Sequence, residues 1–520
     1  MSEPRHSWRN STGSILYPEG ASLATGQPPQ APEFFRDLNL DQVVATVTRG
    51  REEYDLDPFF HAPLTDPDAI TYRQEVMQDL ERPAAMRMIR SFAERTRAMR
   101  AHLATAGRLT YAREKQRWFL SAAETYFDAV ERLLRDLLAV EARSRGLVCM
   151  RDYLASYVAS PAYLGPASEG RRLASDLARI RYGLLIRGNA VTVRNSEGEP
   201  DYSAAVEATF EKFRRGAVED YRVKFSTPVG LNDVEARILD RVARLNPETF
   251  ARLEAYCAQH ADLVDPTVAR FDREVQFYVA YLGFVDRIRG AGLNFCYPQV
   301  SRASKQVSAT AAFDAALASK LVAEGGAVVC NDFVLSGEER ILVVTGPNHG
   351  GKTTFARMYG QLHYLASLGC PVPAAQARLF LCDRLFTHFE KEEGVETGRG
   401  KLLDDLVRIR RILDRATPDS IVIMNEIFSS TTLRDASYLS RKVVERIAEL
   451  GLLAVCVSFL TELASLGERT VSVVSSVDRD DPTVRTYRIE RRPADGLAHA
   501  VAIAAKHRVT YERLMERIKA

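Results

Sequence analysis

The chain has 520 residues, of which 46% are hydrophobic and 27% are charged. At roughly 150 residues per domain, this length predicts about three structural units with the composition of a globular protein. The 70 basic and 68 acidic residues nearly cancel, which excludes a strong overall attraction to nucleic acid but leaves room for a local basic patch.

Signals for membrane insertion and secretion are missing from this sequence. No apolar run approaches the roughly 20 residues that cross a bilayer, and the first residues lack the apolar core of a signal peptide. The seven cysteines are scattered without a C-x-x-C pair, a pattern that favours reduced thiols over disulfides or a metal site. We therefore expect a cytoplasmic protein that does not associate with membranes.

The N-terminal part of the chain changes character after about 33 residues. Residues 1–33 are rich in Pro, Ser, Gly and Gln, which predicts a flexible arm, although its segment SILYPEG could dock as an extended piece. From about 38 to 180 the apolar residues follow helical spacing. Five apolar residues of one predicted helix are expected to share a face: Phe127, Val130, Leu134, Leu137 and Leu138.

A small β element interrupts the helical region. The stretch YGLLIRGNAVTVRN alternates apolar and polar residues around Gly188-Asn189, which predicts a β-hairpin. Helical spacing then returns from about 231 to 290. We therefore expect a helical domain at 34–299 with a small β insert near 182–225.

The pattern after residue 300 changes to alternating strands and helices. Strand-like runs occur at ILVVT, SIVIMN, LLAVCVS, TVSVVSSV and VRTYRIE, and helical segments follow several of them. This order predicts a largely parallel sheet covered by helices, with the last two runs as an antiparallel edge hairpin. The predicted fold class is multidomain α and α/β: a flexible arm, a helical domain and an α/β domain at 300–520.

A complete phosphate-binding motif opens the α/β region. Gly346-x(4)-Gly351-Lys352-Thr353 matches the G-x(4)-G-K-[ST] pattern of a P-loop, or Walker A motif, between the predicted strand 341–345 and a predicted helix. Glycines let backbone N–H groups curl around a phosphate, and the helix N-terminus adds partial positive charge. Lys352 is expected to reach the β- and γ-phosphates, and the Thr353 hydroxyl is expected to ligate Mg²⁺.

A second polar pair ends a neighbouring strand. The run SIVIMN is followed by Glu426, which is placed to be the general base that orients attacking water. Asn425 occupies the position where an aspartate that supports the metal is expected. An amide can accept a hydrogen bond from metal-bound water but brings no charge, so we expect weaker Mg²⁺ support and slow turnover. A buried strand with a solvated glutamate at its end is the alternative.

These motifs resemble those of the MutS family of ATPases. TGPNHGGKTT is similar to the TGPNxGGKST loop of that family, and IVIMNEIFSSTTLRDA is similar to its LVLMDEIGRGTSTYDG segment. VPAAQARLFLCDRLFTHF and DGLAHAVAIAA also have counterparts there, so the likeness covers about residues 300–515. It extends more weakly over the helical half, where DPFFHAPLTDPDAITYRQEVMQDL resembles the start of the MutS core domain.

The resemblance implies a helical core and lever domain followed by an ABC-type ATPase domain that binds ATP and Mg²⁺ and works as a homodimer. It implies nucleotide contacts along one loop, which comprises Gly346, Pro347, Asn348, His349, Gly350, Gly351, Lys352, Thr353 and Thr354. It also places Asn331 and Phe333, in VCNDFVL, near the base; an ordinary turn that enters a strand is the alternative there.

Besides Asn425, the sequence departs from the family pattern at two further positions. Gly400, in GRGKLLDDL, stands where the family has a serine that completes the partner's site; its amide at a helix start could still face a phosphate. Phe459 stands where the family has a histidine that senses the γ-phosphate. The arm at 1–33 is too short for a mismatch-reading domain, and the DNA clamp is reduced to the insert near 182–225.

Two functions remain open from the sequence. The first is a MutS-like ATPase that clamps DNA as a dimer, in repair or recombination, without mismatch selectivity. The second is a catalytically weakened, nucleotide-gated dimer that controls a protein or ribonucleoprotein partner. Basic residues near the insert could meet phosphates without reading sequence, or they could form a solvated surface: Arg187, Arg194, Arg214, Arg215, Arg222 and Lys224.

Overall fold

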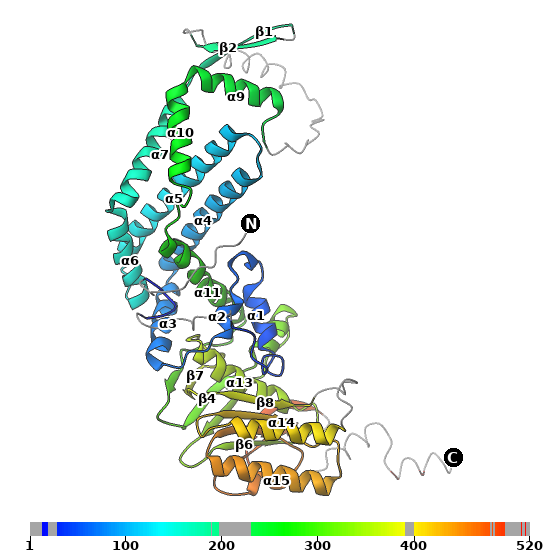
Figure 1. Ribbon diagram of the computed structural model, residues 1–520. Coiled ribbons are helices and arrows are strands. Elements are labelled where there is room, and N and C mark those ends of the chain that lie inside the picture. The colour runs from blue at the N-terminus through cyan, green and yellow to red at the C-terminus, as the bar shows by residue number, and fades with distance from the viewer. Residues whose placement is uncertain are drawn as a thin grey trace. The chain divides into compact units, whose positions relative to one another are not determined.

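The structure is a computed structural model, which describes residues 13–18, 29–188, 190–196, 230–390, 400–478, 481, 484–494, 511 and 515 (Figure 1). Its contacts divide the chain into two compact units. The first unit comprises Met1–Arg82, Arg143–Gly146 and Arg273–Ala520, and the second comprises Pro83–Ala142 and Leu147–Asp272. This division groups the N-terminal helices with the C-terminal region, because their side chains pack together. The domain boundaries expected from the sequence stay a prediction.

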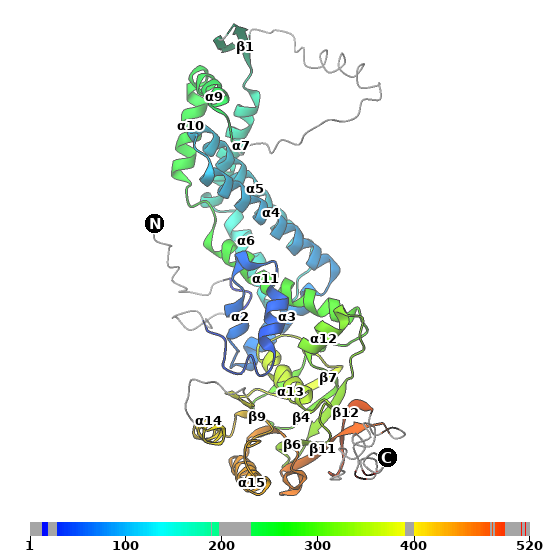
Figure 2. The same cartoon turned by 90° about the vertical axis from the view of Figure 1, so that its right-hand side faces the viewer.

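The second unit is helical, as the spacing predicts. Its helices are α4 (Pro83–Arg108), α5 (Ala112–Val140), α6 (Arg145–Val158), α7 (Pro161–Arg179), α9 (Asp233–Leu245), α10 (Pro247–Gln259) and the first part of α11 (Pro266–Arg289). Helices α4 and α5 lie side by side in both views (Figure 2). At the start of α9, Asn232 and Glu235 form a capping box that satisfies the first free N–H groups.

The apolar face predicted for α5 is confirmed except at one residue. Phe127, Val130 and Leu137 are buried and Leu134 is half-buried, whereas Leu138 is 60% exposed. Leu138 lies in the last turn of α5, about 100° around the helix from Leu137 and on its exposed side.

The predicted β-hairpin is present in the second unit. Strands β1 (Tyr182–Arg187) and β2 (Ala190–Asn195) pair antiparallel, with Leu184 opposite Val193. Val193 packs against the small core that Val242 and Phe250 form, which fixes that face of the hairpin. The rest of the predicted insert, from residue 197 to residue 225, lies outside the described residues.

The first unit begins with short helices that pack with the second part of α11. They are α1 (Leu40–Thr48), η1 (Glu52–Tyr54), α2 (Asp57–His61) and α3 (Pro67–Leu80). Five residues that the spacing places on one face of α11 are all buried: Phe271, Val275, Tyr278, Leu282 and Val285.

A six-stranded sheet forms the centre of the first unit. Its strands are β6 (Ile341–Thr345), β8 (Leu385–Phe389), β9 (Ile421–Asn425), β10 (Leu453–Val457), β11 (Thr470–Val477) and β12 (Arg485–Arg491). They lie in the order β12-β11-β6-β10-β9-β8, and all neighbours are parallel except the antiparallel pair β11–β12. The parallel sheet and the antiparallel edge hairpin predicted from the sequence are confirmed, whereas β8 was not predicted.

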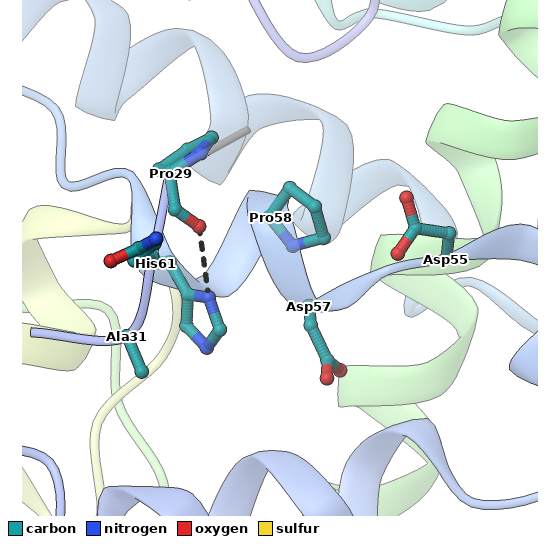
Figure 3. Close-up of a pocket in the computed structure, with 7 residues that line it drawn as sticks. Pro29, Ala31, Asp55, Asp57, Pro58 and His61 are labelled. Atoms are coloured by element: carbon teal, nitrogen blue, oxygen red, sulfur yellow. Dashed lines mark hydrogen bonds between the residues drawn. The ribbon is translucent and has the colours of Figure 1, made fainter. Parts of the chain in front are cut away.

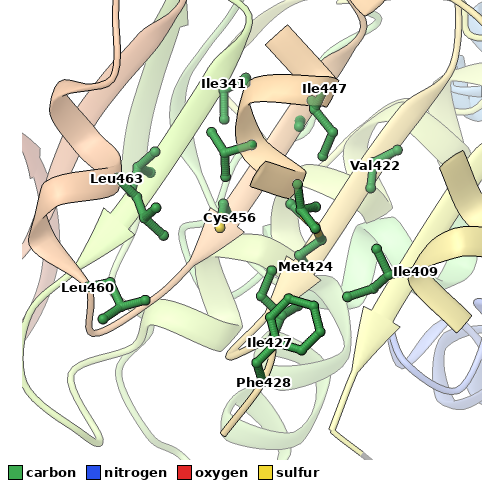
Figure 4. Close-up of a cluster of buried hydrophobic side chains, with 14 of the residues drawn as sticks. Ile341, Ile409, Val422, Met424, Ile427, Phe428, Ile447, Cys456, Leu460 and Leu463 are labelled. Carbon is green, nitrogen blue, oxygen red and sulfur yellow. The ribbon is translucent and has the colours of Figure 1, made fainter. Parts of the chain in front are cut away.

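Helices cover both faces of this sheet because its central strands are apolar on both sides. Helices α14 (Lys401–Arg415) and α15 (Leu433–Leu450) and the short helix η2 (Thr461–Ser465) contribute to one buried cluster, which includes Val422, Met424 and Ile447 (Figure 4). Helix α13 (Lys352–Ser367) packs on the side chains that alternate with these; a Cβ added to Gly360 would lie 2.7 Å from the Cδ1 atom of Ile423.

A second sheet of four strands completes the first unit. Its strands are β3 (Gln299–Ser301), β4 (Val307–Ala312), β5 (Asn331–Leu335) and β7 (Gln376–Phe380), in the order β3-β7-β4-β5, and α12 (Ala315–Ala323) lies between β4 and β5 in the chain. These strands were not predicted, because they are short and carry few apolar runs. The fold is mixed helical and α/β with mixed sheets, which confirms the coarse fold class. No helix among the residues described is long and apolar enough to span a membrane.

Candidate functional site

The phosphate-loop motif forms a tight turn between β6 and α13, at the carboxyl ends of parallel strands. Gly346 and Gly351 have φ angles of 117° and 90°, and His349 has a φ of 59°. These left-handed conformations are readily available to glycine, and they let successive backbone N–H groups turn toward one side. Gly351 is also the residue that precedes α13, so the turn opens onto a helix N-terminus.

Strand β11 supports the turn from behind. The hydroxyl of Ser475 is buried and donates a hydrogen bond to the Gly350 carbonyl at 2.6 Å. A Cβ at Gly350 would lie 2.2 Å from the Ser475 Oγ atom, and a Cβ at Gly346 would lie 3.0 Å from the Ser475 backbone N and O atoms. Close packing therefore requires both glycines, and backbone conformation also requires Gly346.

The side chain of Lys352, the first residue of α13, lies against the turn. Its side chain is 5% exposed, and its ammonium group donates to the Gly346 carbonyl at 2.9 Å, the Pro347 carbonyl at 3.1 Å and the Asn348 Oδ1 atom at 3.3 Å. Burial lowers the pKa of Lys352, which the Glu426 carboxylate, 3.9 Å away, partly opposes. A buried cation surrounded by polar atoms is a site where a multiply charged anion would be stabilised.

The end of β9 brings the two predicted strand-end residues to this loop. The hydroxyl of Thr353 donates to the Asn425 Oδ1 atom at 2.9 Å. Glu426 has a φ of 54°, its N–H donates to the Val457 carbonyl at 2.9 Å, and its side chain is 32% exposed. The backbone has a conformation that is strained for a residue other than glycine, and the carboxylate lies 3.9 Å from the Lys352 ammonium group; its role as a general base stays a prediction.

The donor set fits a magnesium ion that is bound mainly by phosphate and water. Mg²⁺ prefers oxygen ligands and commonly takes one or two from the protein. The Thr353 hydroxyl and the Asn425 amide oxygen are hard oxygen donors, and they already lie side by side. No cluster of three or more histidines, cysteines or acidic residues suited to a metal occurs within the described part of the chain.

The two residues expected near the base have structural contacts of their own. The Asn331 amide donates to the Tyr487 carbonyl at 3.1 Å, and its Oδ1 atom accepts the Ile489 N–H at 2.6 Å. Phe333 is 5% exposed, and its ring centroid lies 5.0 Å from that of Tyr359 on α13. Asn331 thus joins β5 to β12, Phe333 packs in the core, and their assignment to the base stays a prediction.

Tyr487 is a residue of this site that sequence reasoning missed. It has a φ of 58°, is 50% exposed, and its ring Cδ1 atom would lie 3.7 Å from a Cβ on Gly351. Nearby, the Arg485 Nε atom donates to the Asn348 carbonyl at 3.3 Å. The run TYRIE reads as an ordinary edge strand, and only the pairing of β12 with β11, beside β6, brings these residues to the loop.

Gly400 and Phe459, by contrast, lie on open surface. Gly400 precedes α14, as predicted, and a Cβ there would meet no atom within 4 Å. Phe459 is 48% exposed. Beside Gly400, Lys401 pairs with Glu390, which also accepts a hydrogen bond from the Ser429 hydroxyl at 3.0 Å. The structure therefore gathers the loop, Asn425 and Glu426 into one site, whereas Gly400 faces solvent.

A hollow elsewhere in the first unit lacks the phosphate-binding groups of the loop. Its volume is about 580 Å³, and it is lined by Pro29, Gln30, Ala31, Asp55, Asp57, Pro58 and His61 (Figure 3). The His61 Nδ1 atom lies 3.2 Å from the Pro29 carbonyl oxygen. No residue of the phosphate loop lines this hollow, and we take the loop as the candidate functional site because its groups converge.

Comparison with known proteins identifies the region that contains this loop. Residues 342–511 match the family model for MutS domain V. The chain is also 32% identical over 167 residues to the DNA mismatch repair protein MutS from each of two strains of Chloroflexus aurantiacus. This alignment covers 32% of the chain and 16% of each MutS protein. The resemblance to the MutS family is therefore confirmed over the C-terminal region, and the likeness of the helical half stays a prediction.

Proposed function

We propose, from the membership of residues 342–511 in the MutS family, that the chain is a MutS-like protein that binds and hydrolyses ATP and binds DNA as a homodimeric clamp. One observation carries this proposal: the phosphate loop, Lys352, Thr353, Asn425 and Glu426 converge on one place. The proposed clamp acts in DNA repair or recombination.

Each residue of the site has a role in this proposal. The backbone amides of the loop and the Lys352 ammonium group bind the phosphates and hold the γ-phosphate in position. Thr353 and Asn425 hold a magnesium ion, which would neutralise charge on the phosphate oxygens when bound. Glu426 orients the attacking water and takes its proton. Because Asn425 is neutral, we expect slower turnover than an aspartate would give.

The aromatic ring of Tyr487 is proposed to pack on the nucleotide beyond its phosphates. The ring is exposed beside Gly351, at the end of the loop that leads into α13. A flat aromatic ring in this position can stack on the base or the sugar of a nucleotide, which adds affinity without charge.

The proposed DNA contact lies in the second unit. Arg187 and Arg194 are exposed on the β1–β2 hairpin, and the strand register puts both on the same face. Phosphate contacts of this kind give affinity that falls steeply with salt and little sequence preference.

A second function is favoured by three departures from the family pattern. Asn425 lacks charge, Gly400 lacks a hydroxyl, and Phe459 cannot donate or accept a hydrogen bond from its ring. These residues favour a nucleotide-gated dimer with little hydrolysis, which would control a protein or ribonucleoprotein partner.

A gel shift combined with a phosphate-release assay separates the two functions. The clamp predicts Mg²⁺-dependent phosphate release and DNA binding that weakens at least tenfold between about 50 and 200 mM salt. Arg187→Ala/Arg194→Ala should weaken DNA binding and leave phosphate release unchanged. Failure to bind DNA at low salt, with or without ATP, would reject the clamp and favour the gated dimer. Asn425→Asp should raise turnover about tenfold if the missing charge limits hydrolysis.

A further inference from the structure

A short N-terminal segment, Gly13–Pro18, lies buried in the first unit, and we call it the N-terminal plug. Ser14, Ile15, Leu16 and Tyr17 are 4%, 0%, 0% and 9% exposed. The N–H groups of Leu16 and Tyr17 both donate to the Ser14 hydroxyl, at 3.2 and 3.1 Å. The docking predicted for this segment is confirmed, but the segment is bent into a turn and is not extended. The rest of the predicted arm before residue 29 lies outside the described residues.

Side chains of α3 and α11 bind the polar groups of the plug. Glu274 of α11 is 3% exposed and accepts hydrogen bonds from the Ser14 hydroxyl at 3.0 Å and from the Ile15 N–H at 2.8 Å. Tyr72 of α3 donates to the Ser14 carbonyl at 2.6 Å, and Tyr278 of α11 donates to the Ile15 carbonyl. A buried carboxylate is stabilised by such donors, so Glu274 favours a segment that offers both an O–H and an N–H.

Arg73 of α3 joins the plug to the carboxyl end of α13. It is 0% exposed; its Nε atom donates to the Leu16 carbonyl at 2.9 Å, and its Nη1 atom donates to the Leu368 carbonyl at 3.1 Å. The Tyr17 ring centroid lies 4.9 Å from the guanidinium carbon. Gly369, with a φ of 74°, permits this approach, because a Cβ there would lie 2.7 Å from the Arg73 Cβ atom. One buried cation thus contacts both the plug and the helix that starts at the phosphate loop.

These contacts differ from those of an ordinary loop. The plug forms no strand pairing and no helix, and side chains from other elements satisfy its backbone N–H and C=O groups. Recognition of a short segment by buried side chains, with apolar pockets for its own side chains, is how proteins bind peptides.

We propose that the N-terminal plug is an internal peptide ligand and that α3, α11 and the end of α13 form its binding site. The site takes a short segment with a hydroxyl residue, two aliphatic residues and an aromatic residue in this order. When the plug is bound, Arg73 fixes the Leu368 carbonyl and so holds the end of the phosphate-loop helix. The occupant is the chain's own segment, which its tether keeps at an effective concentration near the millimolar range.

A peptide-binding measurement on the full-length chain tests this proposal. Ile15→Ser/Leu16→Ser removes the two fully buried apolar side chains of the plug and should release it. A fluorescent peptide of sequence GSILYPEG is titrated with this variant and with the wild type, and its anisotropy is recorded. The peptide should bind the variant at least ten times more tightly than the wild type, because the tethered plug no longer competes.

Two controls make the result specific. Leu138→Ser/Leu164→Ser changes two leucines that are 60% and 53% exposed in the second unit, and it should bind the peptide as weakly as the wild type does. A peptide with the same residues in scrambled order should bind none of the proteins. Equal binding of GSILYPEG to the variant and the wild type, or no binding to either, would overturn the proposal.

Hydrogen exchange measures the coupling to α13. Amides of residues 364–369 should exchange at least tenfold faster in the Ile15→Ser/Leu16→Ser variant and slow again when the peptide is added. Unchanged exchange there would overturn the coupling through Arg73. If the double variant does not fold, Ser14→Ala in the full chain should give the same changes at smaller size, because it removes only one hydroxyl.

An effect on ATP affinity would also follow, and this consequence alone rests on the proposed function. The released variant should bind ATP several-fold more weakly, and the peptide should restore the affinity. If the wild type binds no ATP, the proposed function fails, whereas the peptide binding and the exchange at residues 364–369 still test the plug.

Discussion

The two flanks of the proposed nucleotide site differ in how completely this chain builds them. On the phosphate-loop flank, the Ser475 hydroxyl supports the turn, Lys352 has three hydrogen-bond acceptors, and Thr353 contacts Asn425. On the other flank, which we call the α14 flank, a Cβ on Gly400 before α14 would meet no atom within 4 Å, and Phe459 after β10 is 48% exposed.

This difference indicates which half of the site is formed by the residues of one chain. Packing and backbone geometry require the residues of the phosphate-loop flank, so that flank is complete within one chain. Among the described residues, none lies within 4 Å of a Cβ at Gly400, and Phe459 is half-exposed, so we propose that a second copy of the chain contacts this flank. Substitutions on the phosphate-loop flank should therefore change nucleotide binding or turnover in a monomer and in a dimer. Substitutions on the α14 flank should change them only in a dimer.

The largest expected effect is on turnover at Glu426. Glu426→Gln should lower the rate of phosphate release about 1,000-fold, because a neutral amide cannot take a proton from water. ATP binding should change less than about threefold, since the loop and Lys352 are intact. Steady-state phosphate release and calorimetry check both numbers, with Glu445→Gln on the surface of α15 as the matched control. Turnover equal to the wild type would show that Glu426 is a solvated residue at a strand end.

The next largest expected effect is a loss of stability in acid, which tests whether the buried side of α13 is shielded from water. Burial lowers the pKa of His363 from 6.5 to about 4, so the folded state holds the ring neutral while the unfolded chain protonates it. Above about pH 6.5 this residue therefore costs the folded state no stability. As the pH falls toward 4, it should lower the free energy of unfolding by about 3 kcal/mol.

Urea unfolding at several pH values measures this loss. His363→Gln should flatten the decline between pH 6.5 and 4, because the substituted side chain does not titrate. His61→Gln, at a half-buried histidine, is the matched control and should leave the decline as in the wild type. The same slope in the His363→Gln variant and the wild type would show that the helix is open to water.

A pair of glycine substitutions compares the two flanks directly. Gly350→Ala places a Cβ 2.2 Å from the Ser475 Oγ atom and should weaken ATP binding about 10- to 100-fold, the usual cost of overpacking. Gly400→Ala meets no atom within 4 Å and has a φ of −65°, so ATP binding should stay within about twofold. Calorimetry on both variants gives the ratio. Equal losses would contradict the assignment of the flanks.

The smallest expected effect is at Tyr487. Tyr487→Ala should weaken ATP binding about threefold to tenfold, the usual worth of one aromatic stacking contact. Tyr487→Phe keeps the ring and should bind ATP as the wild type does, which serves as the control. Binding of inorganic triphosphate should be the same in all three proteins, and a loss of triphosphate binding in Tyr487→Ala would place the ring at the phosphates instead.

The phosphate-loop flank could be predicted from the sequence because its signals are local. The glycine spacing, the apolar strand before it and the helical spacing after it all lie within about 30 residues, and each was confirmed as secondary structure. The position of Asn425 and Glu426 at a strand end was also predicted, because an apolar run ends just before them and parallel strands end at one edge; their roles stay predictions.

Other parts depend on contacts between distant residues and could not be predicted. Tyr487 reaches Gly351 only through strand pairing, and Ser475 lies behind the loop for the same reason. The N-terminal plug was predicted to dock, but its turn depends on Glu274, which lies 260 residues away from Ser14 in the chain. Leu138 was assigned to a buried face because helical spacing alone does not show where the neighbouring helices end.

Calorimetric titration of the purified full-length chain with ATP tests the central claim most directly. The claim is that the loop between β6 and α13, with Lys352 inside it, captures a nucleoside triphosphate. We predict that one ATP binds per chain and that Lys352→Ala weakens the binding at least tenfold. A titration without binding heat at any temperature tried, or equal affinity in the wild type and Lys352→Ala, would contradict the account.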